Sequence, residues 1–266
     1  MKAILFDLDD TLYARQDPFC RAFRTVFNPE GTLFPALPPH LADDALEGRG
    51  LWAPGTPDAL TKLYQSFLRH GYAVFEDAMT GRISMDEMYI YRIRESTKEI
   101  GFTLTDEQGL LFQAQYIWQL EHLQTGLVIA ALLDECTAAG CFLGLVTNGT
   151  SEHQRMKYES MDLPRWIPRE HVLASGDVGI SKPDPEILRI AGKRWHLDPS
   201  DTWYVGDHFE HDIIPAAEVG WHTLWICRNE SEKKYEEEGR KLTDRIVYTE
   251  EELLEAITEI VHGEKR

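Results

Sequence analysis

MKAILFDLDDTLY, residues 1–13, is the stretch from which the rest of this sequence is best understood. Residues 3–6 are apolar, as a buried strand would be, and the carboxylates Asp7, Asp9 and Asp10 follow directly. Aspartate is common in turns, so a solvated turn accounts for one or two of these residues. Three carboxylates within four positions repel one another, and they predict a positive group nearby that offsets their charge.

The composition is that of a globular protein with a sizeable core. Of the 266 residues, 43% are hydrophobic and 27% are charged, which is ordinary for such proteins. The formal net charge of −18 disfavours nucleic acid and anionic membranes as partners, because both are bound through basic surfaces. An anionic substrate therefore needs a local positive feature, such as a metal ion, that acts against the overall charge.

The expected compartment is the cytoplasm. The four cysteines are scattered without a Cys-x-x-Cys pair, which in a chain of this length is typical of core residues in a reducing compartment. Asp7 interrupts the short apolar run at the amino end, so we expect no signal peptide. No apolar run approaches the roughly 18 to 20 residues that span a bilayer.

Residues 17–124 are predicted to form an all-α region. A threonine, a proline and an aspartate at residues 56–58 predict the start of a helix that stops at Gly71. Capping boxes at residues 84–87 and 105–108 predict the starts of two more amphipathic helices. No strand pattern interrupts them, so we expect a compact helical subdomain.

Strands alternate with helices after residue 125. Apolar stretches at residues 141–147, 171–175, 202–205 and 221–226 predict four strands, and amphipathic segments separate them. This alternation predicts a parallel sheet covered by helices on both faces. The first strand, residues 3–6, has no partner in the helical region and must join this sheet.

The predicted fold is therefore an α/β, Rossmann-like parallel sheet with helices on both faces and an inserted all-α cap domain. Residues 1–16 and 125–266 form the core, and residues 17–124 form the cap, inserted after the first strand. The charged residues 229–241 are predicted to be a solvated loop or an exposed helix.

Polar side chains follow the four best-defined strands. Ligand-binding groups of open parallel sheets gather at the carboxyl ends of the strands, so we expect these side chains to share one site. They are Asp7, Asp9 and Asp10 after the first strand, Thr147 and Asn148 at the end of the second, Lys182 after the third, and Asp207 and Asp212 after the fourth.

This combination of carboxylates, a hydroxyl, an amide and a lysine suits phosphoryl transfer. A carboxylate that approaches a phosphate dianion meets a repulsion of about 4 kcal/mol per charge pair at 4 Å and an effective dielectric constant near 20. A divalent cation removes this obstacle, and hard oxygen ligands favour Mg²⁺. Lysine and threonine side chains could then bind the remaining phosphate oxygens.

Four stretches resemble, in order, the four motifs of the haloacid dehalogenase (HAD) superfamily: DLDDT at residues 7–11, the strand-terminal TN at 147–148, the lysine of SKPDP at 181–185, and GDHFEHD at 206–212. The resemblance covers residues 1–16 and 125–227, and the helical insertion resembles the first type of cap in that superfamily. Each stretch alone has an ordinary interpretation as a turn, a surface lysine or a helix start. Their order and their places at strand ends favour one site.

The resemblance implies a role for each residue. Asp7 would be the nucleophile that forms an aspartyl-phosphate, and Asp9 would protonate the leaving alcohol and then deprotonate the attacking water. Asp7, the backbone carbonyl of Asp9, and Asp207 would hold Mg²⁺, and Asp212 would support them.

Thr147 and Lys182 would bind the phosphate with help from the backbone amide of Asn148. Many members of the superfamily have glycine at the position of Asp10, so this residue is a departure from the pattern. Dehalogenases of the superfamily lack the second aspartate, because a halide needs no acid to leave. Asp9 therefore favours a phosphatase.

The function that we expect is Mg²⁺-dependent hydrolysis of a small phosphate monoester, such as a sugar phosphate or nucleotide. A phosphomutase similar to β-phosphoglucomutase would use the same site. A phospho-accepting signalling domain also uses aspartate, Mg²⁺, threonine and lysine, but it is about half as long and has no cap.

The partner is expected to be a small phosphorylated metabolite, and both a monomer and a homodimer remain open. Arg82, Arg92 and Arg94 in the cap could bind an anion or be solvated helix residues.

Overall fold

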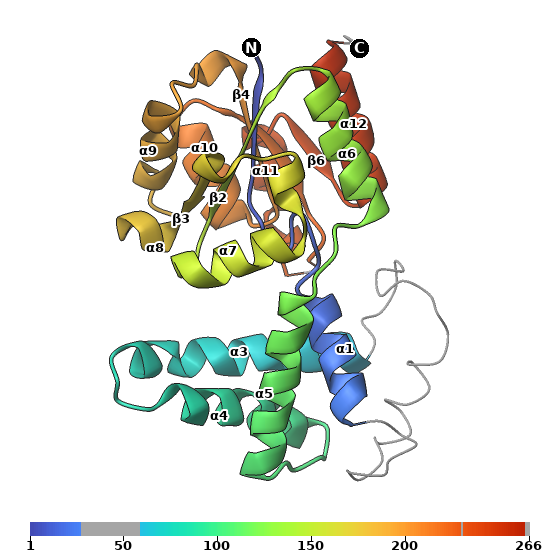
Figure 1. Cartoon of the computed structure of the whole chain (residues 1–266), viewed down its shortest axis with the longest axis vertical. Coiled ribbons are helices and arrows are strands. Elements are labelled where there is room, and N and C mark those ends of the chain that lie inside the picture. Colours follow the sequence, from blue (N-terminus) through green and yellow to red (C-terminus); the bar gives the residue numbers. More distant parts are fainter. Residues whose placement is uncertain (28–58, 230, 264–266) are drawn as a thin grey trace. The chain divides into compact units, whose positions relative to one another are not determined.

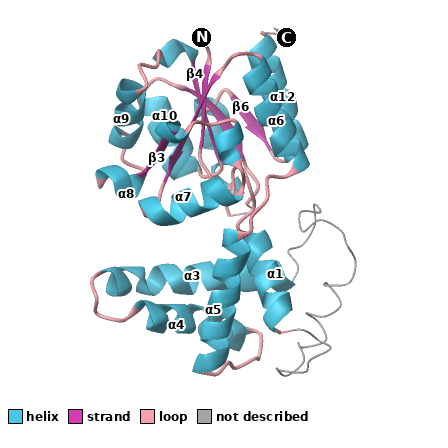
Figure 2. Cartoon of the chain, in the orientation of Figure 1, coloured by secondary structure: helices cyan, strands magenta, loops and turns pink. Residues whose placement is uncertain are grey.

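A computed structural model describes residues 1–27, 59–229 and 231–263 (Figure 1). The chain separates into two compact units: Met1–Ala14 with Leu123–Arg266, and Arg15–His122. The first contains the sheet, and the second is helical throughout its described part (Figure 2). Within the described residues, no helix is both long and apolar enough to cross a bilayer.

The first unit is built on a six-stranded sheet in which every neighbouring pair is parallel. In chain order the strands are β1 (Ala3–Phe6), β2 (Phe142–Thr147), β3 (Val172–Ala174), β4 (Thr202–Gly206), β5 (His222–Ile226) and β6 (Arg245–Val247). Their order across the sheet is β3-β2-β1-β4-β5-β6. The predicted parallel sheet is confirmed, and β1 lies at its centre between β2 and β4.

Helices cover both faces of this sheet. α6 (Leu127–Ala138) packs beside α12 (Glu250–His262) on one face, and α9 (Glu186–Arg194) and α10 (Ile214–Glu218) lie on the other (Figure 1). All residues of β1 are buried, as expected for the central strand of a sheet covered on both faces. Ala3 and Leu5 of β1 belong to the cluster beneath α9 and α10, and by alternation Ile4 and Phe6 face the opposite side.

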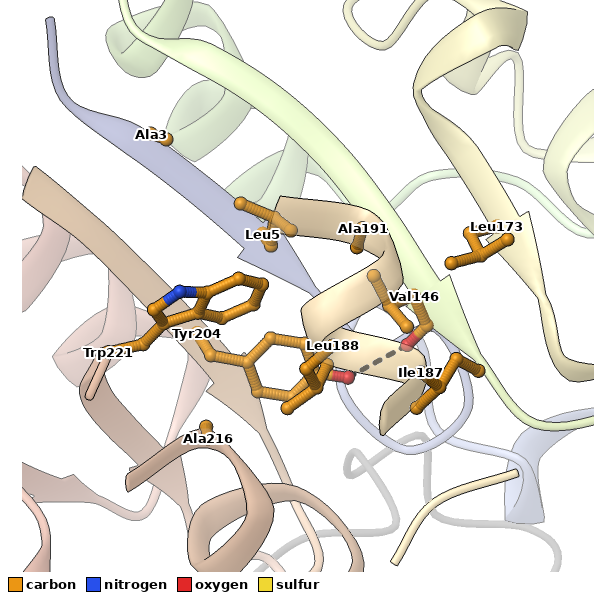
Figure 3. Close-up of a cluster of buried hydrophobic side chains, with 10 residues drawn as sticks. All are labelled: Ala3, Leu5, Val146, Leu173, Ile187, Leu188, Ala191, Tyr204, Ala216 and Trp221. Carbon is orange, nitrogen blue, oxygen red and sulfur yellow. Dashed lines mark hydrogen bonds between the residues drawn. The ribbon is translucent and has the colours of Figure 1, made fainter. Parts of the chain in front are cut away.

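A buried tyrosine joins two strands through this cluster (Figure 3). Tyr204 of β4 is fully buried among aliphatic side chains, and its hydroxyl donates a hydrogen bond to the carbonyl oxygen of Val146 in β2, 2.8 Å away. The bond spans β1, which lies between the two strands, close to their carboxyl ends. The polar end of this core residue therefore lies at the edge of the sheet where the strand-end side chains gather.

The carboxyl-terminal part of the chain differs from the sequence prediction in two respects. Residues 229–241 include the exposed helix α11 (Glu236–Leu242), as expected, but Glu232 is buried and accepts the backbone N–H of Phe209 at 2.8 Å. Beyond them, β6 and α12 complete the sheet and cover its face. The sequence analysis missed β6 because three residues are too few for a periodic pattern.

The helical unit contains α1 (Gln16–Val26), α3 (Ala59–Met79), α4 (Met85–Glu99) and α5 (Asp106–Glu121). Both predicted capping boxes are confirmed, at Ser84 for α4 and at Thr105 for α5. The helix start predicted at residues 56–58 lies outside the described residues. The predicted role of this unit as a cap stays a prediction.

The predicted stop at Gly71 is wrong, because α3 continues for two more turns to Met79. A Cβ atom at Gly71 would lie 3.5 Å from Cδ of Arg92, so α4 packs closely along α3 at this point. An internal glycine costs a helix about 1 kcal/mol relative to alanine, and packing against a neighbouring helix offsets a cost of that size.

Aromatic rings form the core of the helical unit. Phe19 of α1, Phe67 of α3 and Phe112 of α5 pack with ring centroids 4.9 to 5.9 Å apart. The Arg92 guanidinium lies 4.3 Å from the Phe67 centroid and donates a hydrogen bond to Gln113 at 2.7 Å, so it links α4 to α3 and α5. The two other arginines of this region that the sequence analysis considered form ion pairs, Arg82 with Asp77 and Arg94 with Asp106.

We predict that Tyr204→Phe lowers the free energy of unfolding by about 1–2 kcal/mol. The substitution keeps the ring in the core but leaves the buried Val146 carbonyl oxygen without this donor, and an unsatisfied buried polar group has a cost of that size. Urea unfolding followed by circular dichroism measures the change. Phe142→Leu, a change at a partly buried ring of the same face that makes no hydrogen bond, is the control for altered packing alone. An unchanged midpoint for Tyr204→Phe would contradict the prediction.

Candidate active site

Three of the predicted site residues lie at the carboxyl ends of adjacent strands. Asp7 follows β1, Thr147 is the last residue of β2, and Asp207 follows β4. The backbone N–H of Asp7 donates to the carbonyl oxygen of Val205 in β4 at 2.8 Å, so the pairing of the two strands extends to this residue. All three side chains are buried.

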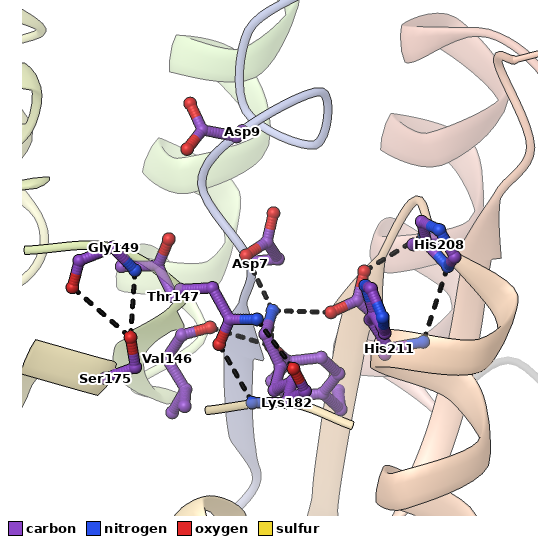
Figure 4. A network of polar contacts seen from close by, with 12 residues as sticks. Asp7, Asp9, Val146, Thr147, Gly149, Ser175, Lys182, His208 and His211 are labelled. Atoms are coloured by element: carbon purple, nitrogen blue, oxygen red, sulfur yellow. Dashed lines mark hydrogen bonds and ion pairs between the residues drawn. The ribbon is translucent and has the colours of Figure 1, made fainter. Parts of the chain in front are cut away.

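Lys182 lies at the centre of the group (Figure 4). Its Nζ donates to Oδ1 of Asp7 at 2.7 Å, to Oδ1 of Asp212 at 2.5 Å, and to the hydroxyl of Tyr204 at 3.0 Å. An ammonium group has three hydrogens, and here each of them has an acceptor. The side chain is only 3% exposed, so two carboxylates and a tyrosine replace its water.

Asn148 positions the backbone of this lysine. Its side-chain oxygen accepts the Lys182 N–H at 2.9 Å, and its side-chain nitrogen donates to the Lys182 carbonyl oxygen at 2.8 Å. The two bonds hold the loop that carries Lys182 against the end of β2. The side chain of Asn148 thus orients the lysine, which leaves only its backbone for the predicted contact with phosphate.

Asp212 reaches the site from the turn after β4. A π-helical turn, Phe209–Ile213, brings the side chain back over the strand end, where Oδ2 accepts the N–H of His208 at 3.0 Å. A Cβ atom at Gly206 would lie 2.4 Å from Cβ of Asp212, so only glycine leaves room for this return. Both oxygens of Asp212 are engaged, one by Lys182 and one by His208.

Ligand oxygens of Asp7, Asp207 and Asp212 all lie within 4.8 Å of one another. Both Asp212 oxygens already accept hydrogen bonds, whereas Lys182 contacts only one oxygen of Asp7, so Asp7 is better placed than Asp212 to hold a cation. Three carboxylates and one ammonium leave two negative charges, which a divalent cation would balance. The buried oxygen-only donor set fits Mg²⁺, which commonly binds one or two carboxylates and keeps several waters.

Burial and charge shift the pKa values of this group. Burial raises the pKa of Asp7 to about 6, although the Lys182 ammonium lowers it, and Asp212 and Asp9 raise it further. Burial alone would lower the pKa of Lys182, but Asp212 and Asp7 raise it well above its usual value. The lysine is therefore a permanent cation. The ionised form of Asp7, in contrast, is disfavoured in the folded protein when no metal is bound.

Asp9 lies apart from this group (Figure 4). Both of its carboxylate oxygens accept Nζ of Lys157 at 2.6 Å, and Oδ2 also accepts the side-chain nitrogen of Gln154 at 3.0 Å. The hydroxyl of Tyr13 donates to Oδ1. Lys157 and Gln154 belong to α7 (Ser151–Ser160), the helix that follows β2.

The sequence analysis missed Lys157, Gln154, Tyr13 and Tyr204. Gln154 and Lys157 are three residues apart in α7, so they lie on one helix face, and a lysine on a helix looks solvated in sequence. Tyr204 is an apolar-looking residue of a core strand. Their polar atoms become significant only when the fold brings them beside the strand-end aspartates.

Asp10 adopts a left-handed backbone conformation, with φ of 60°. Glycine is the default residue for this conformation, and aspartate is among the side chains that tolerate it best. This backbone requirement provides a physical reason why glycine and aspartate can exchange at this position.

The two histidines beside the last motif contact each other. The rings of His208 and His211 are stacked with centroids 4.2 Å apart, and Nδ1 of His208 lies 3.6 Å from the Glu232 carboxylate. Among the described residues, the candidate metal cluster consists of the three aspartates alone.

The sequence model of the haloacid dehalogenase-like hydrolase family matches residues 1–220. The chain belongs to this family. The match includes all four stretches on which the resemblance depends, and the structure brings side chains from each of them to one edge of the sheet.

This HAD-like chain also resembles characterised proteins. It is 36% identical over 98 residues to the phosphoserine phosphatase of Thermus thermophilus, a match that covers 37% of this chain and 39% of that protein. It is 24% identical over 240 residues to the ribulose-1,5-bisphosphate 5-phosphatase of Halopiger xanaduensis, covering 90% of this chain and 99% of that protein. The chain thus covers less than half of the Thermus relative.

Among solved structures, the HAD hydrolase YfnB of Bacillus subtilis, determined with magnesium bound, matches with a TM-score of 0.60 at 20% identity. The match covers 96% of this chain and 98% of that one. At this level of identity the likeness shows the fold.

We predict that Asp7→Asn stabilises the metal-free protein above pH 6. The folded-state pKa of about 6 lies above the unfolded value of 3.8, so ionisation of Asp7 disfavours the fold, and stability is lost as the pH rises from about 4 to 6. Asparagine cannot ionise, so the variant should gain on the order of 2 kcal/mol at pH 7 and nothing at pH 4. Thermal unfolding in a chelator at several pH values measures the gain.

Asp162→Asn is the control, because Asp162 is exposed and asparagine tolerates its left-handed backbone (φ of 53°). This variant should not show the gain in stability at pH 7. An Asp7→Asn protein less stable than the wild type at pH 7 would contradict the prediction.

Proposed function

We propose that this protein is a Mg²⁺-dependent phosphatase that hydrolyses a small phosphate monoester through an aspartyl-phosphate on Asp7. The observation that carries the proposal is the buried Lys182 ammonium, held between Asp7 and Asp212 beside Asp207. The ammonium attracts a phosphate anion to the Asp7 carboxylate that would attack it, and the carboxylates together would hold the divalent cation that offsets their repulsion.

In the proposed first step, the free oxygen of Asp7 attacks phosphorus in line with the leaving oxygen. Oδ1 of Asp7 is engaged by Lys182, and Oδ2 accepts no hydrogen bond among the described residues, so it is available for attack. Lys182 would exchange one of its three present acceptors for a phosphate oxygen, and the Thr147 hydroxyl would bind another. Asp9 gives a proton to the departing alcohol. The bond to the leaving oxygen breaks as the Asp7–phosphorus bond forms.

In the second step, water attacks the phosphorus of the aspartyl-phosphate. Asp9, now a carboxylate, accepts the proton of this water, inorganic phosphate leaves, and Asp7 is regenerated with its original oxygens. Asp7 and Asp207, with the backbone carbonyl of Asp9, would hold Mg²⁺, which neutralises charge on the nucleophile and the phosphate.

A small substrate is favoured over a phosphoprotein. The unit of residues 15–122, helical in its described part, is inserted directly after the β1 loop that carries Asp7 and Asp9. We propose that it acts as a cap that excludes bulk water during the reaction. The named activities of the Thermus and Halopiger relatives, on phosphoserine and ribulose 1,5-bisphosphate, support a small phosphorylated metabolite.

Dehalogenation is an alternative hydrolysis, because haloacid dehalogenases are among the solved structures with this fold. A halide leaves without a proton, so a dehalogenase has no use for a second carboxylate that donates one. Asp9 is retained here and is held by an ammonium, an amide and a hydroxyl. The three donors that hold Asp9 favour a function for this carboxylate, and protonation of an alcohol leaving group is such a function.

We predict that the wild type releases phosphate from a small monoester only when Mg²⁺ is present. The panel comprises phosphoserine, ribulose 1,5-bisphosphate, other sugar phosphates, nucleoside monophosphates and p-nitrophenyl phosphate, assayed with Mg²⁺ and with a chelator. Asp7→Asn should lower release at least about 1000-fold, since the covalent route is lost, while Asp162→Asn should match the wild type.

A wild type that releases no more phosphate than Asp7→Asn across the whole panel would contradict the proposal. Isomerisation of a sugar phosphate that requires a sugar bisphosphate would then identify a phosphomutase. An aspartyl-phosphate that persists for minutes would instead indicate a phospho-accepting signalling domain.

A further inference from the structure

A second lysine is also buried, and the proposed mechanism does not use it. Lys157 of α7 is only 3% exposed, and its Nζ lies 2.6 Å from both oxygens of Asp9. Burying an ammonium is costly unless it is paired. A partner on the loop after β1, rather than on the helix itself, ties α7 to the catalytic loop.

Gln154, one helical turn before Lys157, connects the same carboxylate to the second motif. Its side-chain nitrogen lies 3.0 Å from Oδ2 of Asp9, 2.5 Å from the Thr147 hydroxyl and 2.8 Å from the Asn148 carbonyl oxygen. Asp9 and Thr147 therefore lie within reach of one nitrogen atom. The proposed proton-transfer group and a proposed phosphate ligand are held side by side.

The chain makes room for this connection. Gly149 has a φ of 142°, and a Cβ atom there would lie 3.0 Å from the Gln154 side chain, closer than ordinary contact. Gly149 also donates its N–H to the Ser175 hydroxyl at 2.9 Å, which fixes the backbone at this glycine (Figure 4). The approach of Gln154 to Asp9 thus depends on a glycine at this position.

We propose that Lys157 and Gln154 are positioning residues for Asp9: they fix its carboxylate beside Thr147, where it accepts the proton of the water that hydrolyses the aspartyl-phosphate. The inference rests on the proposed function. With an ammonium on both oxygens, the carboxylate is held in one orientation as a proton acceptor. A base must lie within hydrogen-bond reach of its water, and a well-placed one contributes about 10²–10⁴-fold to the rate.

The test separates the two steps by the choice of leaving group. p-Nitrophenolate leaves without a proton, so the first step on p-nitrophenyl phosphate does not need Asp9, whereas the second step needs a base with any substrate. Lys157→Met should leave the rate of the first turnover within about threefold of the wild type and slow steady-state turnover at least about tenfold. p-Nitrophenolate should then appear in a burst of one equivalent, and acid-quenched enzyme should carry phosphate on Asp7.

Arg155→Met is the matched control. Arg155 is a cation of the same helix, but it is exposed and pairs with Asp177 at 2.8 Å, so the substitution removes the same charge without touching Asp9. Its burst and steady-state rates should equal those of the wild type. Thermal unfolding of each variant shows whether the fold is retained.

A double-mutant cycle asks whether Lys157 acts through Asp9. In an Asp9→Asn background the carboxylate is gone, so Lys157→Met should cost less than about twofold more, although it costs at least tenfold alone. The double variant removes both members of a buried ion pair and should retain the fold even if Lys157→Met does not. Gln154→Met provides a second single variant, with the same selective loss of the second step.

Three results would overturn the inference: an active wild type with Lys157→Met unchanged, a burst and a steady-state rate that fall together, or a further tenfold loss in the Asp9→Asn background. Failure of the proposed function gives a different result: the wild type then releases no more phosphate than Asp7→Asn.

Discussion

The buried contact of Lys182 with Asp7 and Asp212 is the interaction on which the rest of the site depends. It joins the end of β1, the loop before α9 and the turn after β4 through one nitrogen atom, and Tyr204 attaches that atom to the sheet. A buried ion pair contributes little net stability, because desolvation offsets the attraction. The contact therefore keeps these elements in one arrangement rather than making the fold stable.

Each of the two proposed catalytic aspartates has its own lysine, and the difference between the two pairs explains how adjacent carboxylates can do different work. Lys182 shares its charge between Asp7 and Asp212, and burial raises the pKa of Asp7 although the Lys182 ammonium lowers it. Lys157 contacts both oxygens of Asp9, to which Gln154 and Tyr13 also donate. The first arrangement leaves an oxygen for a metal or for phosphorus, and the second fixes an orientation.

The sequence predicts those features that depend on local residue patterns, and it does not predict those that depend on contacts between distant parts of the chain. The parallel sheet and the strand-end positions of Asp7, Thr147, Lys182 and Asp207 follow from short apolar runs and the residues after them, because parallel strands end at one edge. Lys157 could not be found in this way, since its partner lies 148 residues away in the chain. The helix through Gly71 and the short β6 depend on packing against neighbours, which local patterns do not contain.

The constraints on the site are therefore partly constraints on the backbone. Gly206 must lack a side chain so that Asp212 can return to Lys182, Gly149 must leave room for Gln154, and Asp10 must tolerate a left-handed conformation within the loop that carries both catalytic aspartates. None of these three residues needs to touch a substrate. A Cβ atom at Gly206 would nevertheless displace Asp212, and one at Gly149 would displace Gln154. A shift of about 1 Å in a reacting group is enough to cost much of a rate. The motif side chains alone therefore do not guarantee a working site. The residues between them must also allow the backbone conformations and close approaches that bring these side chains together.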